Sequence, residues 1–220
     1  MKKVGMVVGI EEPAISKRYG NGIVLSDRHG TVLYQLDRAQ VYMICCGPGE
    51  IVAAASTQFL IDKYDVDLII NYGVAGGCSR AVEPGDVCVV ESVIQFDYDI
   101  SAMCGEEPCK YVRFPSVYIP VTQRLVDLVK QKNQRVKKVI CASGDKLVAD
   151  PIEKTAMYVR YGTEICDMEA AGIAITCFSN NVPCLVIKFV DKSDTGKEAD
   201  SYEDLQKAAD NALCVMESVI

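Results

Sequence analysis

The chain has 220 residues, of which 50% are hydrophobic, and its 30 acidic and 23 basic side chains give a formal net charge of −7. This length and apolar fraction are enough for a sizeable core, and we expect a single domain over residues 1–220. The negative charge would repel a phosphate backbone and no run of Lys and Arg offsets it, so nucleic acid is excluded as an expected partner. No apolar run approaches the ~20 residues needed to span a bilayer, and we expect no membrane association.

Eleven cysteines are present, and most lie within apolar runs, such as Cys45 and Cys46 in VYMICC and Cys184 in PCLVIKF. No C-x-x-C pair is available to chelate zinc, so we expect reduced, buried cysteines and neither a metal nor a cofactor. The N-terminal segment MKKVGMVVGIEEP reaches acidic residues after a short apolar run. This pattern indicates a first strand rather than a signal peptide, and we expect a cytoplasmic protein.

Short runs rich in β-branched residues predict strands that are buried on both faces. They are Val4–Val8, Val41–Cys45, Val66–Ile70, Asp86–Val90, Val136–Cys141 and Cys184–Val190. Helical patterns alternate with them at Gly49–Tyr64, Thr122–Lys132, Pro151–Tyr161, Met168–Ser179 and Tyr202–Val219, the last with Ser201 as the expected cap. The alternation predicts an α/β fold with a mostly parallel sheet and helices on both faces.

Two segments do not fit this alternation. The run GIVLSDRHGTVLYQL predicts a β-hairpin with its turn at Ser26–Gly30. His29, the only histidine, lies in that turn, and we expect a surface residue because a catalytic base is normally held on a rigid, enclosed element. The irregular segment Asp97–Ser116 is long enough to be a lid or an interface arm.

Ligands of parallel sheets bind beyond the carboxyl ends of the strands, which makes the residues there candidates for a site. Glycine-rich turns at these ends would let the backbone approach a ligand or offer helix N-terminal amides to it. The dinucleotide and ATP motifs G-x-G-x-x-G and G-x-x-x-x-G-K-[ST] are absent from the expected places, so NAD and ATP are disfavoured. The candidate segments are Glu11–Glu12, Gly47–Glu50, Asn71–Gly77, Asp167–Ala171 and Phe189–Asp194.

Four of these segments carry carboxylates. An acidic residue at a helix start often only complements the helix dipole, and Glu169 taken alone has this explanation. Several carboxylates that converge on one rim of a sheet are less easily explained by capping. The pattern therefore favours an enzyme.

The motifs Gly5–Glu12, GPGEIVAAAS, INYGVAGG, SGD, DMEAAGIA and FVDKSD occur in this order over nearly the whole chain. Together they resemble the methylthioadenosine/S-adenosylhomocysteine nucleosidases of the purine nucleoside phosphorylase superfamily. The resemblance implies a three-layer α/β/α sandwich around a twisted, partly barrel-like mixed sheet, and usually a homodimer. It also implies hydrolysis of the N-glycosidic bond of a purine nucleoside such as 5′-methylthioadenosine or S-adenosylhomocysteine.

By this resemblance Glu169 would bind the ribose hydroxyls and Met168 would pack under the sugar. Asp191 would protonate N7 of the departing adenine, and Glu12 would activate the attacking water. Cleavage of a C–N glycosidic bond places positive charge on the sugar and negative charge on the base. A carboxylate near the sugar and a carboxylic acid near the base would stabilise these two charges.

The resemblance also implies a base pocket formed by residues 143–148. The Val148 backbone would bond the base edge, and Leu147 occupies the position of the family's stacking aromatic residue. Tyr72 and Phe189 are the candidate replacement rings. In the glycine motif, Gly76 would lie against the substrate, and Val74 stands where the family has a small hydroxyl residue.

The sequence departs from the family at two catalytic positions. An ungapped comparison puts Pro13 at the water-activating Glu and Lys192 at the catalytic Asp, whereas a slip of one residue brings in Glu12 and Asp191. These departures and Val74 leave open a nucleoside-binding homologue without catalysis. A phosphorylase is the other alternative, because Lys17 and Arg18 lie near the first candidate segment and could hold the phosphate. The segment Met103–Phe114 is the expected arm that reaches a neighbouring subunit.

Overall fold

The computed structural model describes residues 1–192 and 202–220, without the side chain of Lys192. Its strands are β1 Lys2–Val8, β2 Ile23–Val24, β3 Val32–Gln35, β4 Ala39–Cys45, β5 Leu68–Gly77, β6 Val87–Gln95, β7 Ile119–Pro120, β8 Lys137–Ser143, β9 Ile165–Asp167 and β10 Cys184–Lys192. Its helices are α1 Glu12–Tyr19, α2 Glu50–Tyr64, α3 Ser101–Cys104, α4 Gln123–Lys132, α5 Pro151–Tyr161, α6 Ala170–Asn180 and α7 Tyr202–Glu217.

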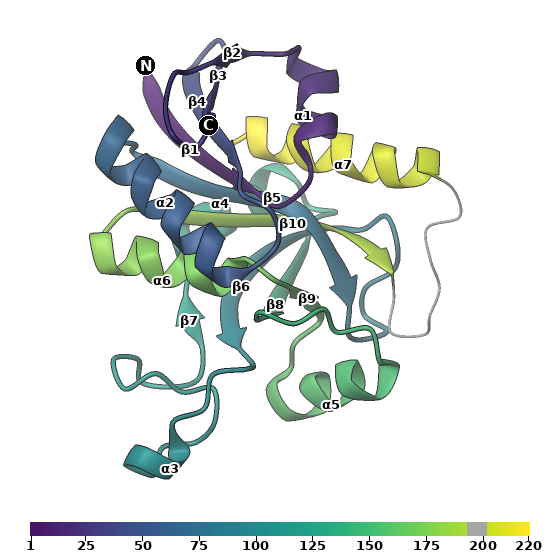
Figure 1. Ribbon diagram of the computed structural model, residues 1–220. Helices are drawn as coiled ribbons and strands as arrows, with labels where there is room; N and C mark the ends of the chain where they lie inside the picture. Colours follow the sequence, from purple (N-terminus) through teal and green to yellow (C-terminus); the bar gives the residue numbers. More distant parts are fainter. Residues whose placement is uncertain (193–201) are drawn as a thin grey trace.

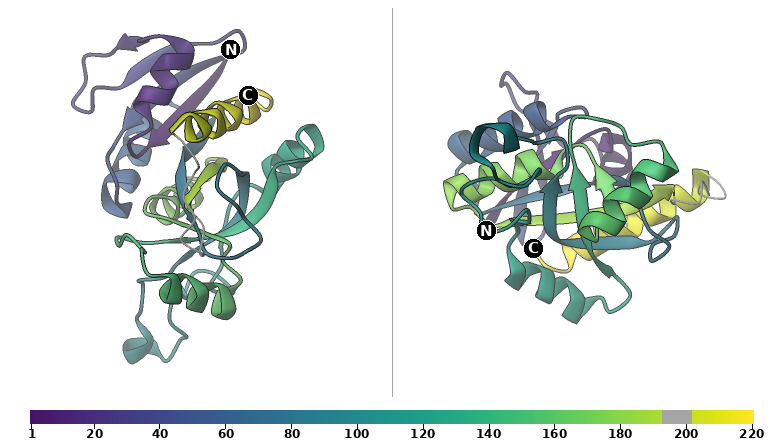
Figure 2. Two further views of the ribbon diagram at one scale, coloured as in Figure 1. Left: turned by 90° about the vertical axis from the view of Figure 1, so that its right-hand side faces the viewer. Right: turned by 90° about the horizontal axis from the view of Figure 1, so that it is seen from below.

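One mixed sheet runs through the molecule in the order β10-β6-β8-β9-β5-β1-β4-β3-β2, and β7 pairs with β6. β10 also pairs with β5, so β5, β10, β6, β8 and β9 close into a barrel-like ring from which the remaining strands extend. Helices α2 and α6 pack together on one side, while α1 and α7 lie on the other (Figures 1 and 2). The predicted three-layer fold with a partly barrel-like sheet is confirmed.

Strand β5 is longer than expected from the sequence. The apolar run was expected to end in a glycine turn at Asn71, but the strand continues through the glycine motif to Gly77. Its last residues have partners on both sides, because Val74 pairs with Phe189 of β10 and Gly76 pairs with Cys166 of β9. The glycines of this motif therefore lie within a strand that is paired on both sides, and they do not form a turn.

Two elements near the candidate residues were missed. Helix α1 begins at Glu12 with Pro13 in its first turn, a favourable place for proline because amides there have no intrahelical partner. Its only buried side chain is Ile15, so it has no periodic apolar stripe to predict it. Strand β9 has only 3 residues, too few for an alternating pattern.

The predicted hairpin is present as the antiparallel pair β2 and β3. Asp27 Oδ1 accepts hydrogen bonds from the backbone N–H groups of His29 and Thr31, at 2.8 and 3.1 Å, which closes the turn. The half-buried ring of His29 lies 4.3 Å from the ring of Phe59 on α2. Among residues 1–192 and 202–220, no helix is both long and apolar enough to cross a membrane.

Candidate active site

Glu11 follows β1 and its carboxylate lies over the glycine motif of β5. Oε1 accepts a hydrogen bond from Val74 N at 2.9 Å, and Oε2 accepts one from Ile10 N at 2.8 Å. A Cβ on Gly73 would lie only 2.7 Å from Glu11 Oε1, so glycine is required for this close approach. The carboxylate is thereby fixed at the end of the parallel pair β1 and β5.

Glu169, at the start of α6, lies beside Glu11. A Cβ on Gly9 would lie 3.2 Å from Glu169 Oε1 and 3.6 Å from Glu11 Oε2, so both carboxylates border the same point of the backbone. Burial raises the pKa of Glu169; the ammonium of Lys188 counters this rise, and Asp167 and Glu11 add to it. Two carboxylates from distant parts of the sequence thus share one site.

Lys188 is the cation of this site and has no exposed surface. Its Nζ lies 2.6 Å from Asp167 Oδ2 and 3.5 Å from Glu169 Oε2. Burial alone would lower its pKa, but the charges of Asp167 and Glu169 raise it above the ordinary value. Sequence reasoning missed Lys188, although a lysine in the apolar strand Cys184–Val190 is a signal, because a buried ammonium needs a partner.

Glu50 and Ser143 extend the cluster toward α2 and β8. Both are buried, and Ser143 Oγ contacts Glu50 Oε1 and lies 2.6 Å from Asp167 Oδ1. Glu50 Oε2 accepts a hydrogen bond from Gly172 N on α6. Burial, and then the charge of Asp167, raise the pKa of Glu50 to about 8. The sequence placed Ser143 in the expected base pocket and Glu50 in a candidate segment, but it predicted no contact between the two side chains.

Glu12, the expected water-activating residue, begins α1 and is half-buried. Burial and then the charge of Glu12 raise the pKa of Tyr34 on β3. The carboxylate that lies beside Glu169 is instead that of Glu11, one residue earlier.

Asp191 lies half-buried near the end of β10, where the pairing with β5 is irregular. Val190 pairs with Ala75 and Lys192 pairs with Gly76, so Asp191 is the extra residue of a bulge. Bulges often re-aim a side chain next to an active site. Ser193, Asp194 and the expected cap Ser201 lie outside the described residues.

The residues expected around the base differ in how far they are exposed. Val148 is buried in a small apolar cluster against which Phe96 packs, whereas Leu147 is 77% exposed. Met168 is half-buried between β9 and α6. A Cβ on Gly76 would lie 3.1 Å from the Nζ of Lys154, which is on α5.

The two candidate replacement rings, Tyr72 and Phe189, belong to the main core, with their centroids 5.8 Å apart. Tyr72 Oη donates a hydrogen bond to Ala209 O on α7 at 3.0 Å. Neither buried ring is therefore free to stack on a base in this arrangement.

Lys17 and Arg18, the candidate phosphate ligands, face α7. Arg18 Nη2 lies 2.7 Å from Glu217 Oε2, and Lys17 Nζ donates to Gln206 Oε1 at 2.8 Å. These contacts hold both cations against α7 and not beside the carboxylates of Glu11 and Glu169. In the described ranges, no three His, Cys, Asp or Glu side chains are grouped so that they could hold a metal ion.

Comparison with known proteins agrees with this fold. The model of the phosphorylase superfamily matches residues 4–220. A 5′-methylthioadenosine/S-adenosylhomocysteine nucleosidase of Staphylococcus aureus is 30% identical over 186 residues, which are 82% of this chain and 81% of that relative. One from Shewanella sediminis is 30% identical over 189 residues, 83% of this chain and 81% of that relative.

A solved structure shows the same architecture. The nucleosidase of this name from Neisseria meningitidis, in complex with methylthio-immucillin-A, superposes with a TM-score of 0.87 at 24% identity. The superposition covers 100% of this chain and 98% of that chain. The chain belongs to the phosphorylase superfamily and, within it, to the family of 5′-methylthioadenosine/S-adenosylhomocysteine nucleosidases.

Proposed function

We propose that this chain hydrolyses the N-glycosidic bond of a purine nucleoside of the 5′-methylthioadenosine or S-adenosylhomocysteine type and releases the free base. The observation that carries this proposal is the meeting of Glu11 and Glu169 across Gly9. Relatives at 30% identity bear the name of such nucleosidases, which supports the same substrate class here.

In this proposal Glu169 binds the ribose hydroxyls and stabilises the positive charge that develops on the sugar. Met168 packs under the sugar. Glu11, and not Glu12, orients and deprotonates the attacking water. Two backbone amides hold the Glu11 carboxylate in place, so it needs no rearrangement before it reacts.

The departing base requires a proton donor. We assign Asp191 as the acid that protonates the purine, because the bulge in β10 sets its carboxyl apart from the strand pairing. Val148 and Leu147 are assigned to the base subsite, and Val74 and Gly76 to the backbone that lies under the substrate.

Charge favours water over phosphate as the nucleophile. Glu11, Glu50, Asp167 and Glu169 are all buried, with Asp167 and Glu169 beside Lys188, and a phosphate dianion would be repelled by any of the four that is ionised. Lys17 and Arg18 are engaged with α7 and are not available to offset this repulsion.

Purified protein tests this function directly. It is incubated with 5′-methylthioadenosine in buffers with and without phosphate, and free adenine is measured. We expect adenine to be released at the same rate in both. Release only with phosphate would make the chain a phosphorylase, and binding without release would make it a silent homologue.

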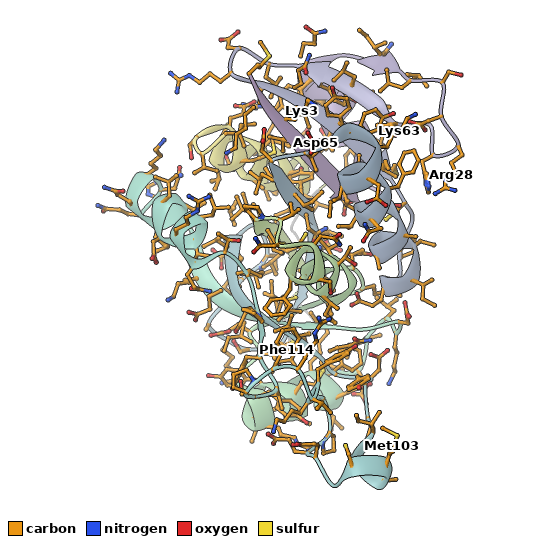
Figure 3. The ribbon with its side chains drawn as sticks, turned by 90° about the vertical axis from the view of Figure 1, so that its left-hand side faces the viewer. Lys3, Arg28, Lys63, Asp65, Met103 and Phe114 are labelled. Carbon is orange, nitrogen blue, oxygen red and sulfur yellow. The ribbon has the colours of Figure 1, made fainter. Side chains whose placement is uncertain are left out.

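We further propose that the enzyme is a cytoplasmic homodimer of methionine salvage. Exposed apolar side chains occur on the neighbouring helices α2 and α6, namely Ile51, 77% exposed, and Phe178, 47% exposed. Met103, 79% exposed, lies on α3 at the far end of the molecule from Lys3, and Phe114 lies nearer the body (Figure 3). A second copy would cover the exposed side chains of Ile51, Phe178 and Met103, so sedimentation should give twice the mass of the chain.

A further inference from the structure

The first turn of α6 is held by three side chains from three other elements. Ala170 N donates to Asp167 Oδ2 at 3.2 Å, Ala171 N donates to Ser143 Oγ at 3.1 Å, and Gly172 N donates to Glu50 Oε2. Helix N-terminal amides have no intrahelical partners, so these bonds determine where the helix begins. Glu169 directly precedes this turn, and its position depends on them.

A count of protons shows which group around Ser143 is protonated. The hydroxyl has one hydrogen to donate, yet it contacts both Asp167 Oδ1 and Glu50 Oε1 and also accepts from Ala171 N. Asp167 is the ionised partner, because its other oxygen pairs with Lys188 at 2.6 Å. Ser143 therefore donates to Asp167, and the contact with Glu50 requires a proton on Glu50.

We propose that Glu50 is a positioning residue for nucleoside binding, whose protonated carboxyl group clamps Ser143 to the start of α6 and so fixes Glu169. This proposal rests on the proposed role of Glu169 in holding the ribose. The Glu50 O–H donates to Ser143 Oγ, while the other carboxyl oxygen accepts from Gly172 N. A Cβ at Gly172 would lie 2.5 Å from the Glu50 carbonyl oxygen, so glycine permits the contact.

The surroundings of Glu50 favour the neutral acid. The carboxylates of Asp167 and Glu169 face it from β9 and the start of α6, and Lys188 of β10 is already paired with both. Tyr111, from the segment before β7, has its pKa raised to about 12 by burial first and then by neighbours that include Glu50. Asp145, after β8, accepts a hydrogen bond from Glu50 N at 2.7 Å.

Loss of the proton breaks the clamp. Burial and the charge of Asp167 raise the pKa of Glu50 to about 8, so the acid ionises as the pH rises through that value. Two carboxylates then face a hydroxyl that has one proton. The start of α6 shifts and Glu169 binds the nucleoside less well, while Glu11 and Asp191 lie on other elements and are spared.

The test compares KM and kcat from pH 6.5 to 9.5 in wild type, Glu50→Gln and a control, Asp62→Asn, on the exposed side of the same helix. Glutamine can donate to Ser143 and accept from Gly172 without titrating. We expect wild type and the control to show a rise in KM of about tenfold above pH 8, equivalent to the loss of one hydrogen bond, together with a fall in kcat, because Glu169 also stabilises the transition state. In Glu50→Gln, KM should stay low across the range.

Two kinetic results would contradict the proposal. An alkaline rise in KM that persists in Glu50→Gln, or a KM for that variant which is high at every pH, overturns the proposal. Infrared difference spectra between wild type and Glu50→Gln at pH 7 provide a readout that needs no turnover, because a protonated carboxyl group has its own C=O band. That band should be present in wild type and lost in Glu50→Gln; its absence from wild type overturns the clamp. A wild type without any base release would instead refute the proposed function.

Discussion

Replacement of Lys188 by methionine tests whether the buried ion pair holds the site together. Lys188 is 0% exposed, and its Nζ lies 2.6 Å from Asp167 and 3.5 Å from Glu169. Methionine keeps much of the volume and removes the charge, so both carboxylates lose their cation. Removal of one partner of a buried ion pair costs about 3–5 kcal/mol. For a chain of this length, that corresponds to a fall in Tm of roughly 6–20 °C.

The loss should depend on pH. Without Lys188, the pKa of Glu169 in the folded variant rises further above its value in the unfolded chain, because Lys188 is the charge that counters this rise. The unfolded state then releases its protons at a lower pH than the folded state, and the stability of the variant falls as the pH rises from about 4. The difference from wild type is therefore smaller at pH 5 than at pH 8.

Urea unfolding followed by circular dichroism at pH 5 and pH 8 measures both effects. Lys188→Arg is the matched control, because it keeps a cation at the same position in β10. A free energy of unfolding for Lys188→Met that equals the wild-type value at pH 8 would refute the structural role given to the ion pair.

Other substitutions test the individual assignments. Glu169→Gln should lower turnover by at least ~100-fold through loss of a transition-state contact, and near-normal rates in a steady-state assay would remove this residue from the site. Asp191→Asn should be damaging and Lys192→Ala mild when kcat is measured; the reverse pattern would support the ungapped alignment. Gly73→Ala would place a Cβ 2.7 Å from Glu11 Oε1, so the carboxylate must move and kcat should fall by ~10-fold or more. An unchanged kcat in that variant would argue against Glu11 as the base.

Much of the fold was predictable because its elements have strong local signals. The apolar runs of β1 and β10 are largely buried on both faces and stand out against polar flanks. Helix α5 was predicted with the bounds that the structure has, Pro151–Tyr161, since proline opens it and glycine follows it. The ordered motifs then indicated the family, which the comparisons confirm.

The site was harder to predict because it depends on single-residue geometry. Two features decide whether Glu11 or Glu12 reaches Glu169: the turn after β1 and the space above Gly73. Neither feature produces a periodic pattern in the sequence. The motif GPGE placed Glu50 at a helix start, where an acid has an ordinary explanation as a dipole complement. Its contact with Ser143 joins residues that are distant in sequence, and no local pattern encodes it.

The most direct test of the account compares Glu11→Gln with Glu12→Gln in single-turnover assays of 5′-methylthioadenosine cleavage without phosphate. Each change removes one carboxylate, and the two positions are adjacent. Comparison of the two variants therefore shows which side chain acts in cleavage of the nucleoside. We expect Glu11→Gln to lose at least ~100-fold in rate and Glu12→Gln to stay within a few-fold of wild type. A large loss in Glu12→Gln with an active Glu11→Gln would contradict the active site described above.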